Sequence, residues 1–155
     1  MKSFVTFLKS PVGRFHTTFA VFILSNLLTG LIGRTGYYPV LSTVHFFTGL
    51  LILAAPAVFL IASKNRAMIL KAFGKMVLPN KADFAKRRVM ALLLKVTALV
   101  VAVGTLVNAV TGVLYRSGVA GPVVFPIHLA AFYGMLAAVP LHALLGLLQR
   151  RGRKH

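Results

Sequence analysis

Four long apolar runs, separated by basic or turn-forming segments, dominate the 155 residues of the chain. They extend over about residues 15–33, 41–63, 89–115 and 123–149. A helix of about 20 mostly apolar residues crosses a bilayer core roughly 30 Å thick, and each run approaches or exceeds that length. We therefore predict an all-α membrane protein in which residues 1–155 form a single domain, a bundle of four transmembrane helices.

The segments between the runs are of two kinds. Residues 34–40 and 116–122 are short and rich in Gly, Pro and Tyr, which predicts tight hairpin turns. The middle segment, residues 65–88, is longer and has apolar residues at helical spacing among its lysines. This spacing predicts an amphipathic helix in the membrane interface that ends at Leu78-Pro79-Asn80, and the alternative is an irregular basic loop. The apolar residues of that helix are Met68, Ile69, Phe73, Met76 and Val77.

The charged residues predict the orientation of the bundle. The chain has 18 Lys and Arg against one acidic residue, Asp83, and its net charge is +17. All the basic residues except Arg34, Lys95 and Arg116 lie in the N-terminal segment, in the middle segment together with Lys64 directly before it, or in the C-terminal tail. By the positive-inside rule, both termini and the middle segment face the cytoplasm of a prokaryotic cell, with the bundle in its cytoplasmic (inner) membrane. Because topology accounts for the charge, we expect lipid as the surrounding partner and no nucleic acid.

The composition also restricts the chemistry. The chain has no cysteine, so it can supply no thiolate ligand to a metal or an iron–sulfur cluster. The near absence of carboxylates argues against hydrolytic acid–base catalysis. Any electron carrier in this chain must be held by nitrogen or oxygen ligands.

Histidines supply such ligands within the apolar runs. The spacing of His128 and His142 in the last run corresponds to roughly 21 Å along a helix and is only about 40° short of four full turns. Both imidazoles therefore leave one face of the helix, one near each side of the membrane. His16 opens the first run, near the cytoplasmic side, and His45 lies early in the second, near the outer side. Matching depths predicts an outer pair, His45 with His128, and an inner pair, His16 with His142.

Two imidazoles per site favour haem over other metal groups. Zinc or non-haem iron would require three or four protein ligands, whereas haem brings four equatorial nitrogens and needs only two axial ligands. Iron with six ligands cannot bind a substrate and suits electron transfer. The alternative is that these histidines are packing or hydrogen-bonding residues of the bundle. Glycines that would make room for the macrocycle, or would serve only close helix packing, are Gly30, Gly49, Gly104, Gly112 and Gly134.

The placement of His16, His45, His128 and His142 resembles that of the di-haem cytochrome b subunits of membrane-bound formate dehydrogenases, uptake hydrogenases and thiosulfate reductases. The resemblance covers the four-span core. It implies two b-type haems and a chain that transfers electrons for a larger oxidoreductase without being its catalytic subunit. It further implies iron–sulfur or catalytic partner subunits on the extracytoplasmic side and a quinone, menaquinone or ubiquinone, near the cytoplasmic face.

Other polar residues in or beside the runs are candidate contacts of these groups. Lys95 lies roughly 10 Å inside the third run, where it would meet a haem propionate or a quinone, or else extend to the lipid headgroups. Arg34 and Arg116 would meet the propionates of the outer haem, or remain solvated turn residues. The polar residues Asn26, Thr105, Asn108 and Thr111 are expected to form interhelical hydrogen bonds.

Two other functions fit the same residues. One is a stand-alone transmembrane electron shuttle or metal reductase, which would bind haem but have no iron–sulfur partner. The other is a haem-free membrane anchor or assembly subunit, in which the histidines only form hydrogen bonds.

Overall fold

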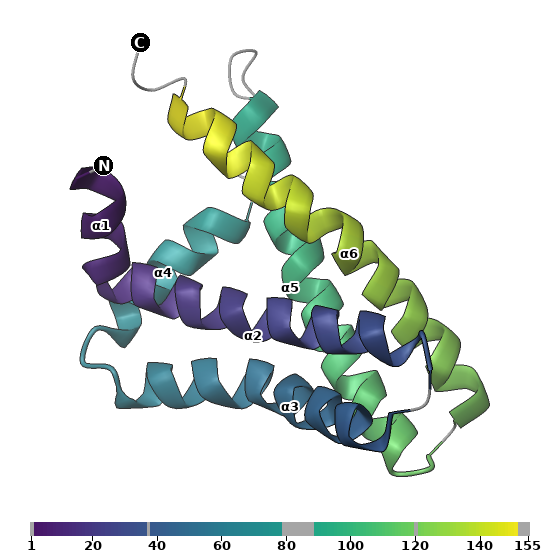
Figure 1. The fold of residues 1–155 in the computed structure, drawn as a ribbon. Helices are drawn as coiled ribbons and strands as arrows, with labels where there is room; N and C mark the ends of the chain where they lie inside the picture. The colour runs from purple at the N-terminus through teal and green to yellow at the C-terminus, as the bar shows by residue number, and fades with distance from the viewer. Residues whose placement is uncertain (1, 37, 79–88, 120, 152–155) are drawn as a thin grey trace.

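A computed structural model describes residues 2–36, 38–78, 89–119 and 121–151, and within these residues it is helical and contains no strands (Figure 1). The four longest helices have the length and apolar composition to cross a membrane, which confirms the predicted fold class and spans. The helices are α1 (Lys2–Lys9), α2 (Pro11–Gly33), α3 (Pro39–Ala62), α4 (Arg66–Val77), α5 (Val89–Arg116) and α6 (Gly121–Arg151). The predictions made for Pro79, Asn80, Lys81, Asp83, Lys86, Arg87, Arg88, Arg153 and Lys154 fall outside the described residues.

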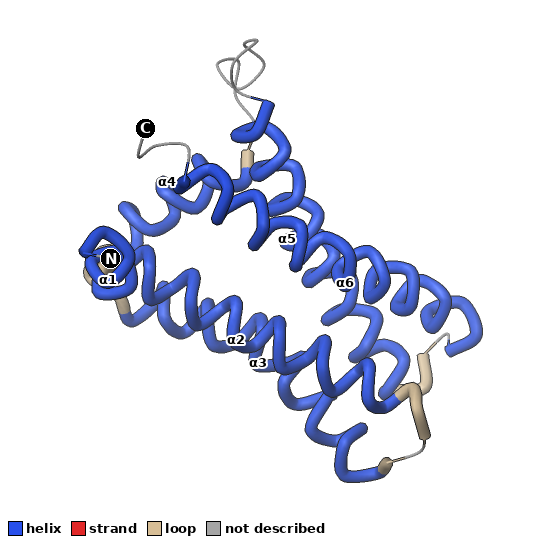
Figure 2. The backbone as a smooth tube through the Cα atoms, turned by 45° about the horizontal axis from the view of Figure 1, so that its top comes forward, coloured by secondary structure: helices blue, strands red, loops and turns tan. Residues whose placement is uncertain are grey.

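The spans form two antiparallel hairpins that pack side by side. Helix α2 runs along α3, and α5 runs along α6, while α3 and α5 join the two hairpins (Figures 1 and 2). The α2–α3 and α5–α6 connections lie at the same end of the bundle, and α1 and α4 lie toward the other end. Below, we call these the turn end and the terminal end.

Local sequence signals define the helix boundaries. Ser10 caps α2 because its hydroxyl accepts a hydrogen bond from the Gly13 amide at 3.0 Å, and Pro11 occupies the first helical position. At the C-terminal boundary of α5, Gly118 has φ 75°, and the Val119 amide donates to the Leu114 carbonyl at 3.1 Å. A glycine is favoured there because this conformation is strained for other residues.

Two short helices complete the fold. Helix α4 confirms the predicted amphipathic helix: Ile69 and Val77 are buried, and Phe73 packs edge-on against Phe15 of α2 at a centroid distance of 5.7 Å. Met68, which is expected on the same apolar face, is 48% exposed. That α4 lies in the membrane interface stays a prediction. Helix α1 was not predicted from the sequence.

An apolar layer fills the middle of the bundle. Ile23, Ile52 and Met135 are at most 4% exposed, and each lies seven residues, or two helical turns, after a histidine of its own helix. Gly104 allows α5 to pack closely against Met135 of α6 in this layer, because a Cβ at position 104 would lie 2.7 Å from Met135 Cγ. Most of the remaining surface of the spans is apolar and exposed, as a lipid-facing surface requires.

Candidate functional site

The four histidines of the spans form two facing pairs. His45 of α3 and His128 of α6 lie at the turn end, with ring centroids 6.2 Å apart. His16 of α2 and His142 of α6 lie toward the terminal end, with ring centroids 6.4 Å apart. The structure thus brings together the residues that the depth argument paired. We call them the turn-end pair and the terminal-end pair, and their role as ligands stays a prediction.

Both separations fit a single metal ion between two imidazoles. A first-row metal–imidazole bond is about 2.0 Å long and the ring centroid lies ~1.2 Å behind the nitrogen, so two opposed ligands have centroids about 6.4 Å apart. Among the described residues, no group of three or more His, Cys, Asp or Glu side chains lies close enough together to hold a metal ion. A ligand set of two imidazoles therefore suits a group that brings its own equatorial ligands, as haem does.

The described hydrogen bonds of His45, His128 and His142 all involve the Nδ1 atom. His45 Nδ1 lies 3.1 Å from the Asn26 carbonyl, and His142 Nδ1 lies 3.2 Å from the Leu94 carbonyl. Because a carbonyl only accepts, Nδ1 carries a hydrogen in these two rings, and in a neutral imidazole this leaves the lone pair on Nε2. His128 Nδ1 lies 3.0 Å from the Thr111 hydroxyl. Each contact comes from a helix that neighbours the one bearing the histidine.

Asn26 also holds the backbone beside His45. Its side-chain amide donates to the His45 carbonyl at 2.7 Å and to the Thr48 hydroxyl at 3.0 Å. The predicted interhelical hydrogen bonds of Asn26 and Thr111 are confirmed. Asn108 donates to Met135 Sδ at 3.2 Å, and Thr105 lies 3.9 Å from the same sulfur, so these two also contact α6.

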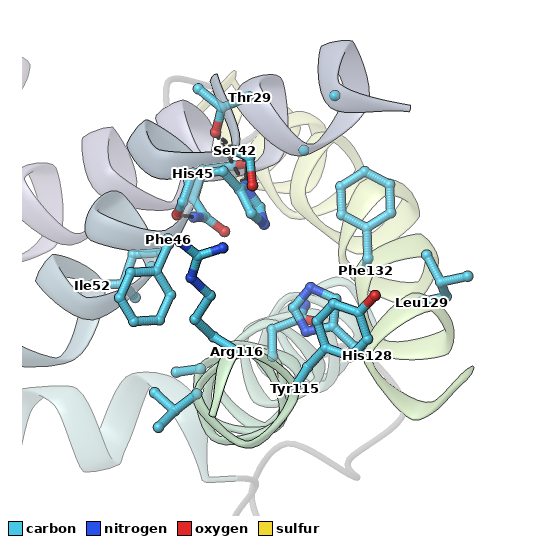
Figure 3. Close-up of a pocket in the computed structure, with 18 of the residues that line it drawn as sticks. Thr29, Ser42, His45, Phe46, Ile52, Tyr115, Arg116, His128, Leu129 and Phe132 are labelled. Atoms are coloured by element: carbon cyan, nitrogen blue, oxygen red, sulfur yellow. Dashed lines mark hydrogen bonds between the residues drawn. The ribbon is translucent and has the colours of Figure 1, made fainter. Parts of the chain in front are cut away.

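A cavity of about 510 Å³ surrounds the turn-end pair, within the size range of cofactor sites. His45 and His128 project into it from opposite sides, between Phe46 and Phe132 (Figure 3). Three of the glycines singled out in the sequence, Gly30, Gly49 and Gly112, line this cavity. The other two do not: Gly104 packs against Met135, and Gly134 lies with Gly104 along a separate apolar groove between α5 and α6.

Gly30 makes the closest approach to the ligand candidates. A Cβ at this position would lie 2.9 Å from His45 Cε1 and 3.1 Å from Phe132 Cε2. The absence of a side chain at Gly30 therefore leaves space for the His45 ring in the cavity.

The predicted cationic contacts occupy different places. Arg34 and Arg116 both line the cavity at the turn end, and the Arg34 guanidinium lies 5.5 Å from the Tyr133 ring centroid. Figure 3 shows the Arg116 side chain extending into the cavity. Lys95 instead donates to the carbonyl of Leu78, which caps the C-terminal end of α4, at 3.3 Å. It adjoins Leu94, the residue that binds His142, and thus belongs to the terminal end.

Helices α1 and α4 bring aromatic side chains to the terminal end. Phe7 of α1 meets the His16 ring edge-on at a centroid distance of 6.1 Å. Phe73 of α4 packs edge-on against Phe15 and Phe19 of α2. Helices α1 and α4 therefore cover this end of the bundle with apolar and aromatic side chains.

Sequence reasoning missed two threonines that contact the histidines. The Thr29 hydroxyl lies 3.2 Å from His45 Nδ1, and the Thr97 hydroxyl lies 3.2 Å from His142 Nδ1. The sequence does contain a pattern that could have indicated the contact of Thr97. The spacing from Thr97 to Thr111 in α5 equals the spacing from His128 to His142 in α6.

A comparison with protein families identifies the family of the chain. Residues 9–155 match the family model of prokaryotic cytochrome b561, and the chain therefore belongs to that family. Comparisons with curated proteins and with solved structures gave no match. Family membership bears out the resemblance to cytochrome b subunits. It makes the chain a multi-pass membrane protein of electron transport that contains haem b.

We expect Gly30→Val to lower the haem content of the purified protein. The added side chain would displace the His45 ring or Phe132, and disturbing the support of a metal ligand typically weakens binding by about 10–100-fold. Haem would be quantified against protein in detergent. Gly134→Val is the matched control, because a Cβ at Gly134 meets no atom within 4 Å. Equal haem content in the two variants would contradict the assignment of this cavity.

Proposed function

We propose that this member of the prokaryotic cytochrome b561 family transfers electrons across the membrane through two b-type haems, each held by two histidines. It links a partner oxidoreductase subunit to the quinone pool. The observation that carries the proposal is the presence of two facing histidine pairs at two levels of α6, with an apolar layer between them. Each pair would hold one haem. Two haems at two depths would allow electrons to pass from one side of the membrane to the other.

The residues present define what the chain contributes. When bound, haem supplies a reversible one-electron couple at its iron. His45 with His128, and His16 with His142, would occupy both axial positions, so that no site remains for a substrate on the metal. Phe46 and Phe132 beside the turn-end pair, and Phe7 beside His16, would limit the access of water to haems held there.

The charged residues would orient the cofactors. Arg34 and Arg116 line the turn-end cavity, which suits them to bind the propionates of the haem there. Lys95 is next to the residue that anchors His142, so it would interact with a propionate or a quinone at the terminal end.

Sidedness follows from the distribution of charge. We propose that the terminal end, with both termini and α4, faces the cytoplasm, because nearly all the basic residues belong to segments connected to that end. The partner subunit would then dock at the turn end, on the extracytoplasmic side. Menaquinone or ubiquinone would react at the terminal end. The family membership argues against the haem-free anchor, whose purified form would be colourless.

Single histidine variants test the pairing. His45→Ala and His128→Ala should each lose the turn-end haem and keep the other, because an axial ligand is removed from one site only. His16→Ala and His142→Ala should lose the terminal-end haem instead. Reduced-minus-oxidised spectra and redox titrations would show the signal of one haem missing in each variant. The two variants of one histidine pair should lose the same haem signal.

His155→Ala provides the control, because that residue lies beyond the four spans and should leave both components in place. Two haems retained in any of the four variants within the spans would contradict the pairing.

Purification of the complex tests the partner. Mild detergent extraction from the native membrane should yield the chain together with an iron–sulfur protein, and the complex should reduce or oxidise a soluble quinone analogue. A haem-loaded chain that is isolated alone and exchanges electrons with soluble metal complexes, but not with quinones, would point to the stand-alone shuttle.

A further inference from the structure

The hydrogen bonds to the histidines follow one repeated pattern. Wherever a described hydrogen bond anchors a histidine of the spans, a threonine takes part: Thr29 for His45, Thr111 for His128 and Thr97 for His142. In two of the three cases the carbonyl three residues earlier in the same helix, that of Asn26 or Leu94, also accepts from the imidazole. The histidine thus faces a paired acceptor, a carbonyl and a hydroxyl one helical turn apart.

The direction of these bonds follows from the contacts of the threonines. The Thr29 hydroxyl lies 2.9 Å from the Ser25 carbonyl and 3.0 Å from the Asn26 carbonyl, so its hydrogen is donated back to its own helix. Thr97 and Thr111 have the same contacts with the carbonyls three and four residues before them. With its hydrogen used, each threonine oxygen presents a lone pair, and the Nδ1–H of the histidine donates to it.

The spacing of the pattern matches the spacing of the histidines. Thr97 and Thr111 face His142 and His128 in the antiparallel α5–α6 pair, and the two threonines are as far apart along α5 as the two histidines are along α6. Thr97 and Thr111 are each 7% exposed, so water does not substitute readily for their oxygens. Packing alone does not explain why a threonine oxygen lies on the ring nitrogen of three of the four histidines of the spans.

We propose that Thr29, Thr97 and Thr111 are positioning residues that fix the tautomer and the plane of the axial histidines and thereby lower the reduction potentials of the haems. The inference rests on the proposed function, because it takes these histidines to be haem ligands. An acceptor on Nδ1–H makes the imidazole a stronger electron donor, which stabilises the oxidised iron. The same bond prevents the ring from rotating about its bond to the helix. The ring planes of the turn-end pair meet at 88° and those of the terminal-end pair at 32°.

Replacement of each threonine by valine tests this role, because valine keeps the shape and removes the oxygen. Thr97→Val should raise the potential of one haem only, and Thr29→Val and Thr111→Val should raise that of the other. The double variant T29V/T111V should shift one potential by about the sum of the single shifts, whereas T97V/T111V should shift both potentials. Redox titration followed in the α band would measure these shifts.

A second measurement reports on the ring planes. The low-temperature electron paramagnetic resonance spectrum of oxidised bis-histidine haem depends on the angle between its two imidazoles. The valine variants should move or broaden the signal of the affected haem and leave the other signal unchanged. Thr→Ser variants retain the hydroxyl and should restore both the potential and the signal. If a valine variant does not accumulate, alanine at the same position removes the oxygen without adding bulk.

Thr43→Val is the control. Thr43 is an exposed threonine of α3 whose hydroxyl bonds to the Pro39 carbonyl of its own helix at 3.0 Å; its described hydrogen bonds include no histidine, and it does not line the turn-end cavity. Potentials equal to those of the unmodified protein in all three test variants, or an equal shift in Thr43→Val, would overturn the inference while the haems remain bound. Absence of haem from the unmodified protein would instead show that the proposed function itself fails.

Discussion

The hydrogen bond from imidazole Nδ1–H to a neighbouring helix is the constraint on which this structure depends. An imidazole placed among apolar spans must have its N–H bound, because an unsatisfied polar group in hydrocarbon costs several kcal/mol. His45 meets this requirement on α2, and His128 and His142 meet it on α5. These bonds join α2 to α3 and α5 to α6 and hold each of the three imidazoles through its Nδ1 atom. Helix packing within each hairpin and the placement of these histidines are therefore linked.

The histidine levels and the apolar core form separate layers of the bundle. Two helical turns separate each of His16, His45 and His128 from a buried apolar residue of the same helix, so the histidine levels are separated by a packed layer. Gly104 lies midway between Thr97 and Thr111 and allows α5 and α6 to approach at this layer. The bundle is thus tightly packed in the middle and open at the turn-end pair, where its cavity lies.

The sequence was sufficient to predict the spans, the amphipathic helix α4 and the pairing of histidines by depth. Length, hydropathy and the constant rise of a helix per residue determine these features, and none depends on side-chain detail. The threonine partners Thr29 and Thr97 were not predicted, because a threonine in a span usually bonds only to its own helix. Its place opposite an imidazole depends on the rotation of two helices about their axes. The different surroundings of Gly30, Gly104 and Gly134 likewise depend on which helix faces meet.

The most direct test of the account is the number and ligation of the haems in the unmodified chain. Haem would be quantified against protein in the detergent-purified protein, and spectra of the reduced form would be recorded with and without carbon monoxide. The account predicts about two b-type haems per chain, a sharp α band and no spectral change with carbon monoxide, because histidines occupy both axial positions. One haem per chain, or a spectrum that carbon monoxide changes, would contradict it.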